Sequence, residues 1–425
     1  MTFRIRHFRY LIAALLFLAT MINYADRLAL SVVSPFLRQE FGMSEQDYSH
    51  VVFLFLTAYA IFYALSGPIV DRLGTRRGFA LAILSWSLAA MSHALARGKW
   101  SLGFCRFLLG AGEPGNWPAA AKAVAEWFPA HQRAFGVGIF NAGSSIGSAL
   151  APPVVAWLTL AYGWRAAFVW TGAVGLLWLG LWLLFYQPPH LSRFITTREW
   201  DYLKDHVRPP EETVPAPLPR GEWLRVIRRR ECYSLILARF FTDPVIYFII
   251  FWLPEYLRKE RQFDLARIGK YAWVPFIFGD IGYLLGGWFS GYLMRRGWPL
   301  PRARKLVLLC GAAVMPAGIF ATLAPDARAA IALTCCMTFG HALWVSNLLT
   351  LPTDLFPGPQ VATASGFTGM GGAVGGMLAT LGTGYIVQRF SYQPIFTVAG
   401  LMHPLALTLV LWLLPDRRFA IGKHA

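Results

Sequence analysis

Four charged residues stand inside apolar stretches that are each long enough to cross a lipid bilayer. They are Asp26, Arg27, Arg106 and Glu113. An ionised group costs about 2.5 to 3.5 kcal/mol at the centre of a membrane helix, so such residues usually line a polar route. Arginine binds a carboxylate through two parallel hydrogen bonds, and a buried carboxylate can take up a proton. These residues predict the movement of a charged solute together with protons.

The spacing of these residues suggests how solute binding and proton binding could be linked. Arg106 and Glu113 are seven residues apart, which places them on one helix face about 10 Å apart along the axis. We expect Arg27 and Arg106 to bind a substrate carboxylate, and Asp26 and Glu113 to carry the coupled proton. An anion that engages Arg106 would weaken its hold on Glu113 and so favour protonation. Asp26 and Arg27 point about 100° apart, and the sequence leaves open which of them faces the cavity. It also leaves the proton stoichiometry open.

Solute hydroxyls need uncharged polar partners near the bilayer midplane, where carriers commonly bind their substrates. The polar and aromatic candidates for substrate binding are Tyr24, Tyr59, Asn141, Tyr247, His341, Trp344 and Asn347. Helix packing is the alternative for each of them, and His341 could also pass protons. Asp280 is a further candidate, whereas contact with Arg239 would explain Asp243. The five cysteines have no metal-binding spacing. We expect no metal and no cofactor other than the proton as coupling ion.

The composition predicts an all-α integral membrane protein. Apolar residues make up 56% of the chain and charged residues 14%, and the apolar residues come in blocks of about 20. We expect twelve transmembrane helices in two bundles of six. Their expected ranges are 10–31, 48–68, 79–97, 101–125, 134–157, 165–186, 233–257, 268–293, 304–324, 327–350, 361–386 and 393–414.

The net charge of +17 is explained by topology rather than by nucleic acid. Most basic residues fall on the side that both termini share, which the positive-inside rule makes cytoplasmic. We expect an N-terminal half over 1–187, a cytoplasmic linker over 188–232 and a C-terminal half over 233–425. Prolines at 209, 210, 215, 217 and 219 favour an extended linker. The architecture needs no protein partner, so we expect a monomer that contacts lipid, protons and a small organic anion.

Two stretches suggest that the halves are duplicated. GPIVDRLGTRR at 67–77 and GGWFSGYLMRRGW at 286–298 each join a glycine-rich helix end to a basic turn. The first resembles the loop signature of the major facilitator superfamily, G-x-x-x-D-R-x-G-x-R-R, which implies a conformational latch between the halves. The matching residues are Gly67, Asp71, Arg72, Gly74, Arg76 and Arg77. In the second stretch Gly291 stands where an acid is usual, which would weaken a latch there.

A narrower resemblance comes from NYADRLALSVVSP (23–35) and RFLLGAGEPGNWPAAAKAVAEWFP (106–129), which are similar to the anion:cation symporter family. Stretches 240–257, 340–357 and 361–378 resemble hexuronate transporters. The resemblance implies proton-coupled import of a hexuronate, such as glucuronate or galacturonate, across a bacterial cytoplasmic membrane by alternating access. The alternative solutes are an aldonate or an aldarate.

Other classes lack their signatures. The sequence has no G-x-x-x-x-G-K-[ST] loop for ATP and no H-E-x-x-H or G-x-S-x-G motif of an enzyme. A solute sensor built on a carrier fold remains an alternative, because it would keep the binding site.

Overall fold

The computed structural model describes residues 4–207, 221–264, 267, 270–416 and 419. The described chain is helical, and its β-structure is limited to one isolated bridge between Ile5 and Ile195. The linker prolines at 209, 210, 215, 217 and 219 lie outside the described residues. The all-helical class predicted from the composition is therefore confirmed.

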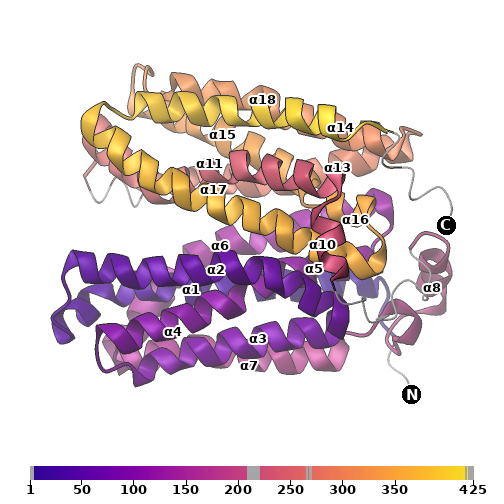
Figure 1. Cartoon of the computed structure of the whole chain (residues 1–425), viewed down its shortest axis with the longest axis horizontal. Coiled ribbons are helices and arrows are strands. Elements are labelled where there is room, and N and C mark those ends of the chain that lie inside the picture. The colour runs from indigo at the N-terminus through magenta and orange to yellow at the C-terminus, as the bar shows by residue number, and fades with distance from the viewer. Residues whose placement is uncertain (1–3, 208–220, 265–266, 268–269, 417–418, 420–425) are drawn as a thin grey trace. The chain divides into compact units, whose positions relative to one another are not determined.

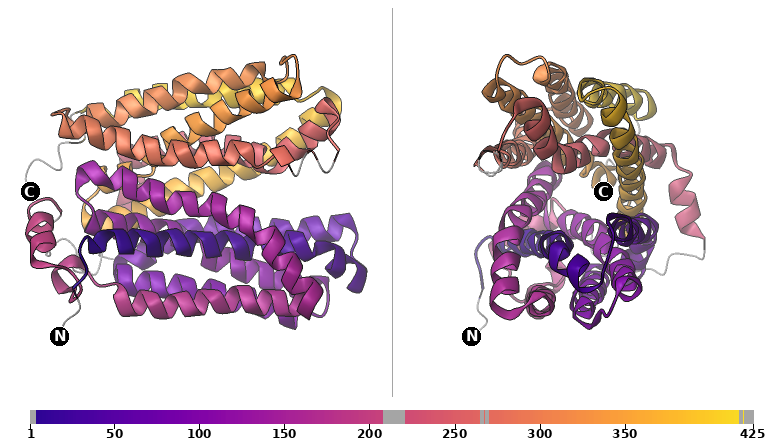
Figure 2. Two further views of the ribbon diagram at one scale, coloured as in Figure 1. Left: turned by 180° about the vertical axis from the view of Figure 1, so that it is seen from behind. Right: turned by 90° about the vertical axis from the view of Figure 1, so that its left-hand side faces the viewer.

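The chain forms two compact units (Figure 1). Unit 1 comprises residues 1–129, 139–226 and 356–367, and unit 2 comprises 130–138, 227–355 and 368–425. Each unit is a bundle whose long helices pack side by side (Figure 2). Helix α6 (Ala130–Tyr162) therefore begins in unit 2 and continues in unit 1 from residue 139. Helix α17 (Val361–Arg389) begins in unit 1 and continues in unit 2 from residue 368.

Unit 1 is built from the helices of the first half of the chain. They are α1 (Phe8–Glu40), α2 (Glu45–Leu73), α3 (Thr75–Ser92), α4 (Lys99–Gly112), α5 (Asn116–Trp127), α6 (Ala130–Tyr162) and α7 (Trp164–Phe185), with the short α8 (Thr197–Lys204) and α10 (Glu222–Ile227) after them. Single 3-10 turns lie at η1 (His93–Leu95), η2 (Glu113–Gly115) and η3 (Pro189–Leu191).

Unit 2 is built from the helices of the second half. They are α11 (Arg230–Arg261), α13 (Val274–Arg295), α14 (Leu300–Val314), α15 (Ala327–Leu348), α16 (Leu351–Leu355), α17 (Val361–Arg389) and α18 (Gln393–Leu413). The 3-10 segments η4 (Met315–Ala321) and η5 (Gly358–Gln360) follow α14 and precede α17.

Every span predicted from the sequence overlaps one or more of these helices. Ten helices of the described chain are long and apolar enough to cross a membrane. The remaining two predicted spans, 101–125 and 268–293, fall on α4–η2–α5 and on α13. The first is interrupted at Pro114, which has no backbone N–H for a helical hydrogen bond. The second begins only at Val274. Twelve membrane crossings with both termini in the cytoplasm therefore stay a prediction.

Two glycines set the sharp helix junctions of unit 1. Gly74 separates α2 from α3 with φ 76°, and Gly163 separates α6 from α7 with φ 85°. Only glycine adopts these values without steric cost, because it lacks a Cβ. The chain therefore reverses within one residue at each place, and α3 and α7 pack side by side in unit 1 (Figure 1).

Candidate functional site

Arg27 of α1 and Glu113 of η2 form a buried ion pair in unit 1. Arg27 Nε donates to Glu113 Oε2 at 2.9 Å, and Nη2 lies 2.8 Å from the same oxygen. The Glu113 side chain is fully buried, whereas the Arg27 side chain is 17% exposed. Asn23 Nδ2 also donates to the backbone carbonyl of Glu113 at 3.4 Å, so α1 passes directly beside η2.

The sequence spacing pointed to Arg106 as a cation that acts on Glu113. The two groups do act on each other electrostatically, but the hydrogen-bonded partner of Glu113 is Arg27. Arg106 Nη1 donates instead to the backbone carbonyl of Arg27 at 3.3 Å. Two helical turns separate Arg106 from Glu113 along one axis, whereas the neighbouring helix brings Arg27 within bonding distance. The structure also answers which neighbour of the Asp26–Arg27 pair is more exposed, since Asp26 is buried and Arg27 keeps some exposure.

Aromatic rings enclose the Arg27 guanidinium. Its Cζ lies 4.8 Å from the centre of the Tyr24 ring and 4.6 Å from that of Tyr59. Trp117 Nε1 donates to the Tyr59 hydroxyl at 2.9 Å, and the Trp117 ring meets Tyr24 edge-on at 6.4 Å. Cation–π contacts of this kind attract the cation and fix its orientation. Tyr24 and Tyr59, predicted as substrate-binding residues, are thus brought together with Arg27, while sequence reasoning missed Trp117.

Asp26 and Arg106 are the two charged side chains of this site whose bonding capacity is least used. Both residues are 1% exposed. Thr171 is the side-chain hydrogen-bond partner of Asp26, and Nε and Nη2 of Arg106 have no hydrogen-bond partner among the described residues. Glu113 and Arg106 both act on Asp26 electrostatically. A buried charge with few bonds is costly, and proton binding by Asp26 and anion binding by Arg106 stay predictions.

Asn141 lies in the same unit as Arg27. It belongs to the part of α6 within unit 1 and is buried. The ring of its neighbour Phe140 lies 6.0 Å from that of Trp117, which places this turn of α6 beside the aromatic residues around Arg27. Contact of Asn141 with a solute stays a prediction.

The candidates from the second half lie in unit 2, and three of them are engaged in its interior. His341 Nδ1 lies 3.1 Å from His403 Nε2, and the buried Trp344 ring meets the His403 ring at 5.5 Å. Asn347 Nδ2 donates to the backbone carbonyl of Gly286 at 3.0 Å. Tyr247 lies on α11, where Gly376 of α17 leaves room for its ring, and Asp280 lies half-buried on α13. Solute binding by these five residues stays a prediction.

Asp71 is the acid of the loop motif at residues 67–77, and it is buried in unit 1. Lys122 Nζ lies 2.7 Å from Asp71 Oδ1, and Thr363 donates to Oδ2 through its backbone N–H and its hydroxyl, both at 2.7 Å. The carboxylate therefore accepts from the first turn of α17, where unsatisfied N–H groups and the helix dipole favour a negative charge. A Cβ on Gly67 would stand 2.3 Å from the Ala362 carbonyl oxygen, so glycine is required for this approach.

The basic residues of the motif take different positions. Arg76 Nη2 donates to the backbone carbonyl of Leu183 in α7, and Trp182 Nε1 donates to the Arg76 carbonyl at 3.0 Å. Arg72 and Arg77 are exposed, and Gly74 forms the junction described above. A latching role for the motif stays a prediction.

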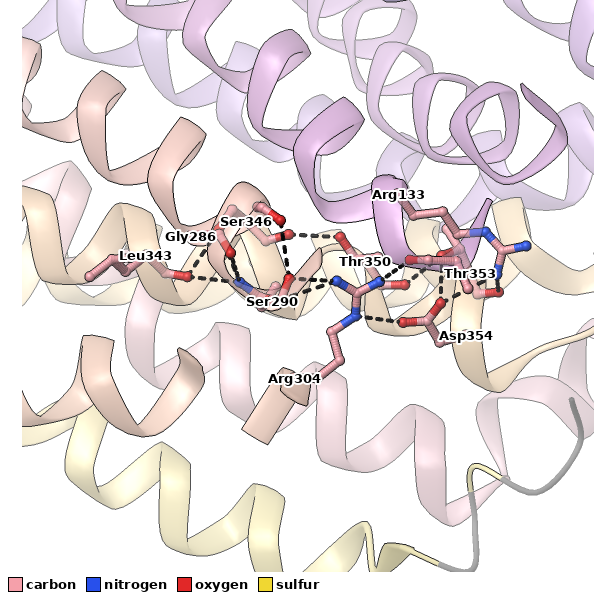
Figure 3. A network of polar contacts seen from close by, with 12 residues as sticks. Arg133, Gly286, Ser290, Arg304, Leu343, Ser346, Thr350, Thr353 and Asp354 are labelled. Carbon is pink, nitrogen blue, oxygen red and sulfur yellow. Dashed lines mark hydrogen bonds and ion pairs between the residues drawn. The ribbon is translucent and has the colours of Figure 1, made fainter. Parts of the chain in front are cut away.

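Unit 2 contains a buried polar network centred on Arg304 (Figure 3). Arg304 Nε donates to Asp354 Oδ2 at 2.9 Å, and its Nη2 donates to the Ala130 carbonyl at 2.8 Å. Arg133 Nη1 lies 3.3 Å from Asp354 Oδ1. Arg304 Nη1 also donates to Ser290 at 2.8 Å and reaches Asn347 Oδ1 at 3.5 Å. The network therefore ties the start of α6 to α14 and α16 within unit 2.

Gly291 of the second glycine-rich stretch lies against the start of α6. A Cβ on Gly291 would stand 2.2 Å from the His131 carbonyl oxygen, so no larger residue fits there without movement. The weaker second latch that the missing acid at Gly291 suggested stays a prediction. Within the part of the chain that the structure describes, no three His, Cys, Asp or Glu side chains gather as a metal site would need.

The chain is similar to known transporters along almost its whole length. A family model described as Major Facilitator Superfamily matches residues 16–380 and 281–425. The chain is 33% identical to the hexuronate transporter of Escherichia coli (strain K12) over 98% of this chain and 96% of that one. It is 29% identical to the D-galactonate transporter of Escherichia coli O6:H1 over 91% of each. The structure of the proton:xylose symporter XylE bound to 6-bromo-6-deoxy-D-glucose superposes with a TM-score of 0.73 at 17% identity, covering 95% of both chains.

Proposed function

The chain belongs to the Major Facilitator Superfamily, and from this premise we propose that it imports a small sugar-acid anion together with protons. It is a multi-pass membrane protein of a transporter family, not an enzyme. The observation that carries the proposal is the buried ion pair between Arg27 and Glu113. A guanidinium that is partly exposed and already bound to a carboxylate is ready to exchange that carboxylate for one on a solute.

Binding and protonation are linked through this exchange. When a solute carboxylate takes the Arg27 guanidinium, Glu113 loses the cation that stabilises its negative charge inside an apolar bundle. Protonation of Glu113 then removes a buried unpaired charge, so the anion and the proton favour each other. Asp26, which is buried close to Glu113 and Arg106, is the second acid that we propose for proton coupling.

Arg106 is poised to bind the same carboxylate from the other side. Two of its nitrogens have no partner among the described residues, and its Nη1 bond to the Arg27 carbonyl holds it beside Arg27. Tyr24 and Tyr59, which stack on the guanidinium, and Asn141 would contact the hydroxyls of the solute. We propose further solute contacts by Tyr247, His341, Trp344 and Asn347, with Asp280 as an additional candidate.

Alternating access requires contacts that hold one conformation and break in another. We propose that the Asp71–Lys122–Thr363 contacts and the Asp354–Arg133–Arg304 contacts are two such latches. The first set joins α2 to the first turn of α17, and the rest of α17 belongs to unit 2. The second set joins α14 to the first turn of α6, and the rest of α6 belongs to unit 1. The latch motif further comprises Gly67, Arg72, Gly74, Arg76 and Arg77.

The solute we propose is a hexuronate such as glucuronate or galacturonate. The similarity to the hexuronate transporter along almost the whole chain supports this choice. An aldonate is the second candidate, because the D-galactonate transporter matches nearly as much of the chain. An aldarate and a non-transporting sensor on the same fold are further alternatives. We place the protein in a bacterial cytoplasmic membrane with both termini inside.

Uptake of labelled glucuronate into proteoliposomes under an inward pH gradient tests the proposal. Accumulation that a protonophore abolishes and that unlabelled galactonate leaves unchanged is the expected result. Uptake that galactonate blocks would move the solute to the aldonates. Binding of sugar acids without any uptake would favour the sensor.

A further inference from the structure

A buried pair of histidines lies in unit 2, outside the site around Arg27. His341 of α15 and His403 of α18 are 2% and 0% exposed, and His341 Nδ1 lies 3.1 Å from His403 Nε2. Their rings meet edge-on at 5.2 Å, and the ring of Trp344 covers His403. His403 Nδ1 is buried and has no hydrogen-bond partner among the described residues.

The chemistry of this pair allows it to take up one proton. A neutral imidazole has one N–H and one basic nitrogen, so the bridge uses one of each. One basic nitrogen remains at an outer end of the pair, whichever tautomer is present. A proton added there turns the bridge into a charge-assisted hydrogen bond, which is stronger. A second proton would place two N–H groups against each other, so the pair accepts one proton and no more.

An ion pair on α11 provides the charges that act most strongly on His341. Arg239 Nε donates to Asp243 Oδ2 at 2.8 Å, and both side chains are largely buried. Asp243 and Arg239 are the charged groups that act electrostatically on His341. Gly372 of α17 leaves the space that the carboxylate occupies, since a Cβ there would overlap Asp243 Oδ2.

The other charged groups on the packed helices have less bearing on the pair. Arg304 and Lys305 of α14 pair with Asp354 and Asp416, and α13 contributes Asp280. The chief electrostatic influence on His403 is His341 itself. Burial disfavours a charge on either histidine, and Asp243 and Arg239 are the charged groups that act on His341 beside it.

We propose that His341 and His403 form a second proton-binding site, linked to the Arg239–Asp243 ion pair and separate from Asp26 and Glu113. An anion that draws Arg239 away would leave the Asp243 charge to stabilise the imidazolium, so anion and proton would again favour each other. This inference rests on the proposed function and adds one proton per solute to it. One extra positive charge per solute would raise accumulation on the order of 50-fold per 100 mV of inside-negative potential.

The test compares wild type with the double variant His341→Asn/His403→Gln in glucuronate-loaded proteoliposomes. Asn and Gln amides can replace the bridging Nδ1 and Nε2 atoms, but they do not take up protons. The charge moved per glucuronate is measured as the voltage, set with potassium and valinomycin, that stops net flux. The double variant is expected to move one elementary charge less per solute than wild type. The single variant His403→Gln, at a residue without a proposed solute contact, is expected to do the same with glucuronate counterflow retained.

His93→Asn is the matched control. His93 is also fully buried and bonds through Nδ1 to the Ala89 carbonyl at 2.8 Å, but it lies in unit 1. This variant is expected to leave the coupled charge unchanged. An unchanged coupled charge in the double variant would overturn the second proton site while proton symport stands. If the double variant loses counterflow and the single variant His403→Gln keeps it, the charge moved per glucuronate is measured in His403→Gln instead. The same outcomes then decide the proposal. Wild type that moves glucuronate independently of protons would overturn both proposals.

Discussion

Gly291 of α13 lies so close to His131 that a Cβ on the glycine would stand 2.2 Å from the histidine's carbonyl oxygen. The usual motif has an acid at this position, whereas in this chain the glycine packs directly against the backbone of α6. Asp354 of α16 binds Arg304 and Arg133 in the same unit. The ion pairs at the start of α6 thus come from residues that are far apart in the sequence.

Restoring the acid at this position should harm the protein. Gly291→Asp would push the start of α6 away and would bury a carboxylate against a carbonyl oxygen. We expect a loss of stability of about 1 to 3 kcal/mol, the usual cost of overpacking, with lower uptake of glucuronate. Thermal unfolding in detergent measures it. Gly98→Asp is the control, because nothing lies within 4 Å of that Cβ and aspartate is favoured before the first turn of a helix. A stable, active Gly291→Asp protein would contradict the required close approach.

Neutralising Asp354 should be more damaging than its size suggests. Asp354→Asn would leave Arg304 and Arg133 buried without a counter-charge, and breaking a buried pair typically costs about 3 to 5 kcal/mol. The melting temperature of the purified protein checks this. Asp416→Asn removes a carboxylate that pairs with Lys305 but is half exposed, and it should change the melting temperature little. Equal effects of the two substitutions would argue against a tightly coupled network around Arg304.

The sequence predicted the helices well because long apolar blocks have few alternatives to a helix in lipid. Every expected span falls on helices, and the two that stay untested as membrane crossings, on α4–η2–α5 and α13, lie where glycine, proline or charge lowers the hydropathy. The charged residues of the first half were also recognised from their burial cost alone. Tyr24 and Tyr59 lie against Arg27, so these three candidates share one location, whereas their binding of a solute stays a prediction.

The pairing of the charges could not be read from the sequence. Helical spacing relates residues on one helix, such as Arg106 and Glu113, but ion pairs form between neighbouring helices, whose order is a tertiary property. The same limit concealed Trp117 and His403, which gain their roles from Tyr59 and His341 on other helices. A tryptophan or histidine within an expected membrane span, with a polar atom to satisfy, was the available signal.

Removing the indole N–H of Trp117 should weaken solute binding modestly. Trp117→Phe keeps an aromatic ring near Tyr24 but deletes the hydrogen bond to the Tyr59 hydroxyl. A neutral hydrogen bond contributes about 0.5 to 1.5 kcal/mol, so we expect roughly a 2- to 10-fold rise in the glucuronate concentration for half-maximal uptake. Trp100→Phe, at an exposed position, should leave this value unchanged. An unaltered value for Trp117→Phe would show that Tyr59 needs no orientation by the indole.

Replacing Arg27 by lysine should separate charge from geometry. Arg27→Lys keeps the positive charge but loses the planar fork that binds a carboxylate through two hydrogen bonds. Loss of one charge-assisted bond, worth about 1.5 to 3 kcal/mol, predicts roughly 10- to 100-fold weaker glucuronate affinity, measured by saturation of counterflow. Arg165→Lys is the control, since Arg165 binds Glu40 at a half-exposed position. Wild-type affinity in Arg27→Lys would exclude a forked contact between Arg27 and the solute.

Replacing Glu113 by glutamine should uncouple transport from protons. In Glu113→Gln the new amide oxygen can still accept from Arg27, so the geometry of the pair is kept, but the side chain no longer binds or releases a proton. Counterflow requires no net proton movement and should persist, whereas accumulation under an inward pH gradient should be lost. Both are measured with labelled glucuronate in the same proteoliposomes. Glu40→Gln, which alters a half-exposed carboxylate bonded to Arg165, should change neither. If Glu113→Gln abolished counterflow and accumulation alike, Glu113 would be needed for binding or folding itself, and the coupled proton would have to be assigned to Asp26 or to the histidine pair.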